Sequence, residues 1–126
     1  MKNIIIDGVE YTPVIKKDEE IAKPIILHKS LIVDFEVYPK DLGRMSWNEA
    51  NKACANLGDG WRLPTKEELN IIYENKNVVG GFANDYYWSS TEYDSNYAWF
   101  QNFNYGFQYN SNKNYTFYVR AVRTIK

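Results

Sequence analysis

Few side chains in this sequence could carry out acid–base, nucleophilic or metal chemistry. The chain has one histidine, His28, and one cysteine, Cys54. A catalytic cysteine needs a base beside it, and a metal site needs several ligands at close spacing. The sequence shows neither pattern, so we expect no catalytic residue, no metal site and no cofactor.

The acidic motifs are explained by local structure. Glu67 and Glu68 fall in the first turn of a predicted helix, where the helix dipole alone favours carboxylates. Asn84 and Asp85 together offer too few oxygen ligands for calcium, which takes about six to eight. We therefore expect the protein to act independently of calcium.

The chain does contain side chains suited to binding a ligand, and they are concentrated in a run from Asp94 to Tyr118. Of its 25 residues, 18 are Asn, Tyr, Phe, Ser or Asp, and none is Leu, Ile, Val or Met. An ordinary core needs aliphatic side chains of several sizes. Antibody loops use a similar alphabet, because Tyr gives a large contact area while Asn and Ser give adaptable hydrogen bonds. We interpret the run as a ligand-binding surface.

The predicted ligand-facing positions are Asn, Asp, Tyr and Phe residues of this run. They are Asp94, Asn96, Tyr97, Phe100, Asn102, Asn104, Tyr105, Phe107, Tyr109, Asn112, Asn114 and Tyr115. The predicted scaffold positions are Trp88, Ser89, Ser90, Trp99, Gly106, Tyr118, Val119, Arg120 and Arg123. Phe103 fits either set.

Three other interpretations compete with a binding surface. A gene rich in A and T would favour Ile and Lys as well, yet of 11 Lys residues only Lys113 lies in the run. A disordered low-complexity tract is disfavoured by strand-like flanks at Trp88 and at 119–122. A β-hairpin that turns at 104–106 agrees with aromatic residues at period two, and we accept it as structure. It does not explain why the second face is also polar and aromatic.

The alphabet of the run also follows from the genetic code, since changing only the adenines of an Asn codon gives Tyr, Phe, Asp or Ser. Three motifs frame the run: Trp61-Arg62-Leu63-Pro64-Thr65, Tyr87-Trp88-Ser89-Ser90-Thr91-Glu92 and Tyr118-Val119-Arg120-Ala121-Val122-Arg123. With them the chain resembles, over about residues 45–126, the variable proteins of diversity-generating retroelements and the collagen-like-adhesin C-terminal domain family.

This resemblance implies a C-type-lectin-like scaffold whose C-terminal surface is rewritten by adenine-directed mutagenesis, although a relative with a fixed surface would keep the same scaffold. The implied fold is shared with the formylglycine-generating enzymes. Those enzymes work with a pair of cysteines, whereas this chain has only Cys54. The resemblance therefore favours a non-enzymatic, receptor- or adhesin-like binding protein. The first alternative is a structural subunit of a phage tail or surface fibre with a fixed surface, and a less favoured one is an enzyme on the formylglycine-generating-enzyme-type fold.

Composition and charge limit the partners. The formal net charge is −1, so the chain lacks the basic footprint of a nucleic-acid-binding protein. No apolar stretch reaches membrane-spanning length, and the run at 4–6 is too short for a signal peptide. We expect a protein or glycan ligand on another cell or particle surface. The expected location is a phage particle, or the cytoplasm before release.

Two predicted helices hold the scaffold. Ser46 is placed to cap a helix that runs to about Leu57, with Cys54 as an inert thiol on its buried face. Thr65 and Glu68 form a capping box that begins a second helix. Residues 78–82, with two glycines, are expected to be a flexible connection.

Extended segments precede and follow the helices. Residues 3–15 predict a hairpin that turns at 7–8, with Pro13 on an edge strand. A strand after 28–30 alternates, with Asp34 and Glu36 on its solvent face. The last strand, 117–125, carries an arginine on each face, to be paired with Glu67, Glu68 or Glu92.

The expected fold class is α+β. We expect a C-type-lectin-like fold with two helices packed on an antiparallel β-sheet and an N-terminal β-hairpin extension. At 126 residues the chain has room for one compact core. The extension is assigned to 1–20, where oligomers could form, and the ligand-binding domain to 21–126.

Overall fold

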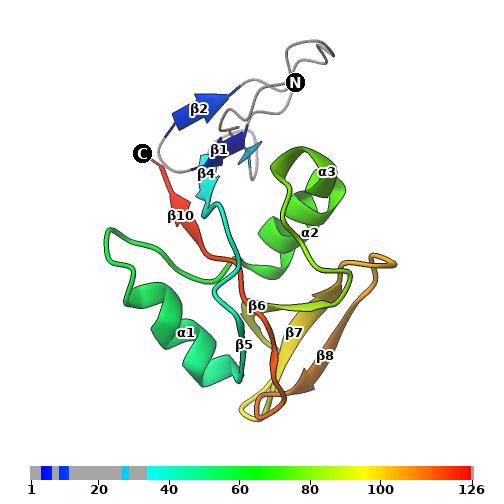
Figure 1. Cartoon of the computed structure of the whole chain (residues 1–126). Helices are drawn as coiled ribbons and strands as arrows, with labels where there is room; N and C mark the ends of the chain where they lie inside the picture. The colour runs from blue at the N-terminus through cyan, green and yellow to red at the C-terminus, as the bar shows by residue number, and fades with distance from the viewer. Residues whose placement is uncertain (1–3, 7–8, 12–26, 29–33, 126) are drawn as a thin grey trace.

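The computed structural model describes residues 4–6, 9–11, 27–28 and 34–125 (Figure 1). Three helices are present in this part of the chain: α1 (Trp47–Ala55), α2 (Lys66–Glu74) and the short α3 (Lys76–Val79). The α+β class and the two longer helices are confirmed. Residues 76–79 form a helical turn, so the prediction of a flexible connection at 78–82 is wrong for its first two residues.

The strands form two sheets. Sheet A has the order β10-β4-β1-β2, with β3 also paired to β4, and its strands are β1 (Ile4–Ile6), β2 (Val9–Tyr11), β3 (Leu27–His28), β4 (Asp34–Val37) and β10 (Val122–Thr124). Sheet B has the order β5-β9-β6-β7-β8, and its strands are β5 (Arg44–Met45), β6 (Tyr86–Glu92), β7 (Tyr97–Asn102), β8 (Gln108–Asn112) and β9 (Phe117–Tyr118). The prediction of an antiparallel sheet is only partly right, because β1 pairs with β4, and β6 with β9, in parallel.

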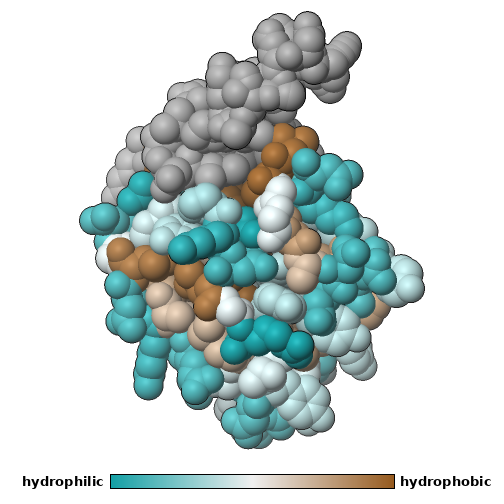
Figure 2. Space-filling view, in the orientation of Figure 1, coloured by the Kyte–Doolittle hydropathy of each residue, from teal (hydrophilic) through white to brown (hydrophobic). Residues whose placement is uncertain are grey.

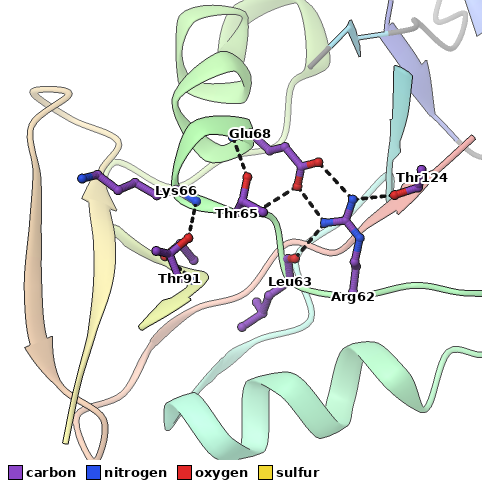
Figure 3. Close-up of polar contacts among 8 residues, drawn as sticks. Arg62, Leu63, Thr65, Lys66, Glu68, Thr91 and Thr124 are labelled. Carbon is purple, nitrogen blue, oxygen red and sulfur yellow. Dashed lines mark hydrogen bonds and ion pairs between the residues drawn. The ribbon is translucent and has the colours of Figure 1, made fainter. Parts of the chain in front are cut away.

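Both long helices begin where their capping boxes predict. The Ser46 hydroxyl accepts a hydrogen bond from the N–H of Glu49, whose carboxylate accepts from the N–H of Ser46 at 3.1 Å. Thr65 and Glu68 make the same reciprocal pair, at 3.1 and 2.9 Å (Figure 3). These bonds satisfy N–H groups that have no partner within the first helical turn.

Sheet B is covered on both faces at β6. Tyr87 and Trp88 are consecutive, so their side chains point to opposite faces, and both are fully buried. Tyr87 packs with Leu69 and Ile72 of α2, whereas Trp88 belongs to a second apolar cluster that contains Ala50 and Cys54 of α1. The two helices therefore hold the same sheet from opposite sides.

The C-terminal segment differs from its prediction. Instead of one strand over 117–125, β9 pairs in sheet B and β10 pairs in sheet A, and residues 119–121 cross between the sheets. Arg120 lies on this crossing, and its side chain is fully buried. The crossing places Val119 and Ala121 in the same apolar cluster as Trp88, and Val122 in the cluster of Tyr87.

The predicted arginine partners are wrong. Arg120 binds Asp41 at 2.9 Å and Arg123 binds Glu36 at 2.6 Å. Glu36 is only 2% exposed, so the predicted solvent face of its strand is covered at this position. Arg123 meets Glu36 because the two residues stand opposite each other in the pairing of β4 with β10, whereas the buried Arg120 is paired with Asp41, which follows β4 in the chain.

The N-terminal hairpin is confirmed where the structure describes it. β1 pairs antiparallel with β2, with Ile6 opposite Val9, and β1 also joins β4 in sheet A. Pro13 and Asp7-Gly8 lie outside the described residues. The division of the chain at residue 20 also falls outside them and stays a prediction.

Candidate functional site

The predicted binding run is built on two hairpins of sheet B. β6 pairs antiparallel with β7, and β7 pairs antiparallel with β8 over five residues, from Tyr97 opposite Asn112 to Gln101 opposite Gln108. The hairpin predicted to turn at 104–106 is confirmed, with its turn at 103–105. Residues 94–118 therefore form sheet B strands and the three loops between them.

The exposed aromatic residues of the run do not share one face. Strand alternation and the β7–β8 register place Phe107 and Tyr109 on the side of Phe100, whereas Tyr97 lies on the opposite side with Trp99. Tyr93, which is 58% exposed, lies near Trp99 with its ring at 5.9 Å. The structure thus divides the predicted surface into two groups.

The larger group is a cluster of aromatic rings, which we call the aromatic platform. Its base is Tyr86, Phe100 and Phe117, whose ring centroids lie 4.7 to 5.2 Å apart. Its exposed members are Phe107, Tyr109 and Tyr115, which are 48, 63 and 60% exposed. Phe107 lies 6.3 Å from Tyr86, and Tyr115 lies 6.4 Å from Phe117. Phe107 and Tyr115 thus contact the base at distances usual for aromatic pairs, and the pairing of Tyr109 with Phe100 places Tyr109 on the same side.

Three predicted ligand positions instead shape the loops. The side-chain oxygens of Asp94, Asn102 and Asn112 each accept a hydrogen bond from the N–H two residues further on, at 2.8, 2.7 and 2.8 Å. This contact is an Asx-turn. The sequence signal is the repeated pattern of Asp or Asn followed two residues later by Asn, which the prediction missed.

The loop tips carry the remaining candidates. Asn96, Asn104 and Asn114 are exposed, and each donates its backbone N–H to the Asx residue before it. Tyr105, which is 77% exposed, follows Asn104 in the same loop. The side chains at these tips are free of the bonds that shape the turns, so they can contact a ligand.

Two candidates are not on the surface. Phe100 is 6% exposed and Asn102 is 7% exposed. Phe100 packs against Tyr86 and Phe117, and Asn102 is held by two backbone N–H groups of its turn. These two side chains support the surface and do not face a ligand from it.

Helix α2 supports the hairpin from the opposite face. Gln101, which is fully buried, donates to Asn70 of α2 at 2.9 Å and to the carbonyl of Gly106 at 2.9 Å. Gln108 donates to the carbonyl of Lys66 at 2.8 Å. The polar second face of the run thus contacts the first half of α2, which explains why this face lacks aliphatic residues.

The titratable groups near the sheet are structural. Burial raises the pKa of the Cys54 thiol to about 12, so it stays a neutral core group, as predicted. Burial and a hydrogen bond to Asp41 raise the pKa of Tyr87, while burial lowers the pKa of Arg120 against the opposing effect of Asp41.

The described residues contain no group of three or more His, Cys, Asp or Glu side chains able to hold a metal ion. None of the helices described is long and apolar enough to cross a membrane.

Comparison with protein families matches the chain, over residues 27–123, to the Lcl C-terminal domain. The chain belongs to this family. The membership predicted from the three motifs is confirmed, and the match covers the whole aromatic platform. No curated protein matches the chain.

The three motifs join one another inside this Lcl C-terminal domain. Residues of the first and third motifs exchange backbone hydrogen bonds at 2.8 Å between Arg62 and Val122. The carbonyl of Pro64 accepts from the N–H of Ser90 at 2.7 Å, and Tyr87 pairs with Tyr118. The motifs therefore fix the meeting point of both sheets.

The first and second motifs also fix α2. The guanidinium of Arg62 binds both oxygens of the Glu68 carboxylate, at 2.7 and 3.0 Å, and reaches Thr124 of β10 (Figure 3). Thr91 accepts from the N–H of Lys66 at 2.9 Å. In the Lcl C-terminal domain the motifs thus act as scaffold, and the loops and strand between the second and third motifs display the exposed residues.

Proposed function

We propose that this chain is a non-enzymatic binding protein with a C-type-lectin-like arrangement, which holds a protein or glycan ligand on the aromatic platform. The observation that carries the proposal is the exposure of Phe107, Tyr109 and Tyr115 beside an aromatic base in which Phe100 and Phe117 are buried. Large apolar groups left in water cost solubility, and patches of them commonly mark interaction sites. Membership of the Lcl C-terminal domain family supports a binding role.

The surroundings of the platform suit a neutral or weakly polar ligand. Two ion pairs lie on or beside the strands of the platform, Arg44 with Asp85 at 3.9 Å and Lys113 with Glu92. Tyr118 lies beneath the Arg44 guanidinium at 5.4 Å. Exposed tyrosines offer both a ring face for apolar or sugar contacts and a hydroxyl for hydrogen bonds. In Figure 2 no wide brown patch covers the region of β7 and β8, in keeping with a surface of Tyr and Asn rather than aliphatic residues.

Diversification of this surface by a retroelement is part of the proposal. It is supported by the family and by the Asn-derived codon alphabet of the exposed tips Asn96, Asn104, Tyr105, Asn114 and Tyr115. A DNA repeat near the gene that differs only opposite adenines, together with a reverse-transcriptase gene, is the expected genomic arrangement. A gene without such a repeat would leave a binding protein with a fixed surface.

The binding proposal is tested with labelled protein on a glycan array and on intact bacterial cells. A variant with Phe107→Ser, Tyr109→Ser and Tyr115→Ser should lose at least tenfold in binding. The matched control, Tyr93→Ser with Tyr97→Ser, removes two exposed tyrosines from the opposite face and should bind like the wild type. Equal loss in both variants, or wild-type binding by the triple variant, would contradict the platform as the binding site.

A further inference from the structure

Strand β8 is an uncovered edge of sheet B. Its inner side pairs with β7, and no strand within the described residues pairs with its outer side (Figure 1). The other edge, β5, is two residues long and carries Arg44, and both shortness and charge protect edges from pairing. β8 has five residues, Gln108–Asn112, with no proline, no charge and no break in its register with β7.

The direction of each backbone group on β8 follows from the two ends of the β7–β8 ladder. Asn102 donates its N–H to the carbonyl of Phe107 at 2.9 Å, and Lys113 donates to the carbonyl of Asn96 at 3.0 Å. Bonded pairs alternate with non-bonded pairs in an antiparallel ladder. Every second residue from 107 to 113 therefore bonds to β7.

The residues between them, Gln108, Asn110 and Asn112, turn their N–H and C=O groups away from β7. The carbonyl of Asn112 accepts one bond from the N–H of Tyr115, inside its own turn. The outward groups of Gln108 and Asn110 have no strand to bond in the described part of the chain. They offer the donors and acceptors that a further strand needs, with Asn110 at the centre.

We propose that β8 pairs with β8 of a second copy of this chain, antiparallel, about a twofold axis at Asn110. In this register Asn110 stands opposite Asn110 of the second copy, and Gln108 stands opposite Asn112. The outward groups lie symmetrically about Asn110, so the strand complements itself. A twofold contact of this kind closes after two copies.

The side chains allow this register. No charged residue lies within Gln108–Asn112, so no like charges face each other across the pair. The adjacent Lys113 directs its amine to Glu92 and to the carbonyl of Ser95 at 3.0 Å, within its own copy. Gln108 likewise bonds to Lys66 and Gln101. Neither long side chain blocks the edge.

The pairing has a consequence for the exposed aromatic residues. Residues paired across a sheet point to the same side, so Tyr109 of one copy lies diagonally across from Tyr109 of the other, within reach of its ring. The two aromatic platforms then lie on one face of a continuous ten-stranded sheet, twice the five strands of sheet B. Two copies would present their platforms in the same direction.

Sedimentation velocity of the full chain between about 1 µM and about 1 mM tests the pairing, since this range brackets weak and moderate association. The wild type should shift from monomer to dimer. Asn110→Pro removes an N–H that β7 does not use, and proline is tolerated on the open side of an edge strand. This variant should keep its melting temperature and remain monomeric. Asn110→Ala keeps the N–H and should dimerise like the wild type.

Two charged variants test the register. Asn110→Glu and Asn110→Lys place like charges opposite each other, so each alone should be monomeric, whereas an equimolar mixture should form a heterodimer. In amide exchange, Gln108 and Asn110 should become at least tenfold slower at high concentration, while Tyr109 and Ser111 are protected throughout. A wild type that stays monomeric, dimers of Asn110→Pro or assembly beyond a dimer would overturn the proposal. None of these results bears on ligand binding by the monomer.

Discussion

Gly106 lies directly against the ring of Tyr73. A Cβ atom built on Gly106 would stand 2.7 Å from Cε2 of Tyr73 and 2.8 Å from its hydroxyl oxygen, which is closer than carbon atoms approach in proteins. Gly106 also has a φ of +95°, in the region that favours glycine. The turn between β7 and β8 thus depends on a glycine for two reasons, and it seats the hairpin on α2.

Gly106→Ala should destabilise the protein by about 2 kcal/mol or more, because it adds a steric overlap to the cost of a positive φ. Gly58→Ala is the matched control, since Gly58 has a φ of +77° but nothing within 4 Å of its Cβ position. The control should cost only about 1 kcal/mol. Urea denaturation of both variants measures the difference. Equal destabilisation of the two variants would show that the Tyr73 ring moves aside at no measurable cost in stability.

Asn102→Ala should destabilise the fold by about 1 to 2 kcal/mol, because two backbone N–H groups of its turn lose their acceptor. Asn104→Ala, two residues further on, removes an exposed side chain and should cost less than about 0.5 kcal/mol. Thermal melts of the pair test whether the first Asx residue shapes the loop. If Asn102→Ala melted at the same temperature as the wild type, residues other than Asn102 would determine the shape of the turn.

Exchange of the exposed tyrosines Tyr105, Tyr109 or Tyr115 for Ser should change the free energy of unfolding by less than about 0.5 kcal/mol. Trp88→Ser and Phe100→Ser should cost about 3 to 5 kcal/mol, because both side chains are packed inside the second apolar cluster. Trp99 is only partly buried, so Trp99→Ser should fall between these groups. Severe loss from all three tyrosine exchanges would identify the run as core.

Stability should fall at high pH through Cys54. Its folded pKa is raised from 9.0 to about 12, so the folded state keeps a proton that the unfolded state loses. The stabilising effect is complete below pH 9 and disappears as the pH rises toward 12, at about 1.4 kcal/mol per pH unit. Urea denaturation at several pH values should show a shallower decline for Cys54→Ala than for the wild type. Parallel curves would mean that the thiol ionises without cost.

The helix starts were predictable because they depend on local chemistry. Thr65 and Glu68 lie three residues apart and bond to each other, so their sequence spacing contains the whole interaction. The same holds for the hairpin turn near Gly106. The partners of Arg120 and Arg123 were not predictable, because Asp41 and Glu36 reach them only through the crossing between the two sheets.

The run proposed to bind ligand was predictable in composition and not in geometry. The alphabet of residues 94–118 separates the run from ordinary core, but it does not reveal which residue of each alternating pair faces outward. Phe100 and Tyr109 stand opposite each other on one face, yet Phe100 lies under Tyr86 near the centre of the sheet and Tyr109 lies at its edge. Strand order decides between them, and strand order is a property of the whole fold.

In each of the repeated Asx-turns, the residue that determines the backbone shape is different from the residues exposed at the loop tip. One side-chain oxygen at the start of each turn, from Asp94, Asn102 or Asn112, holds the backbone, so the neighbouring tip residues contribute little to the shape. A combinatorial library at positions 96, 104, 105, 114 and 115 would therefore sample many surfaces on one unchanged backbone. In engineering terms, the domain is a display scaffold whose anchor points are already known.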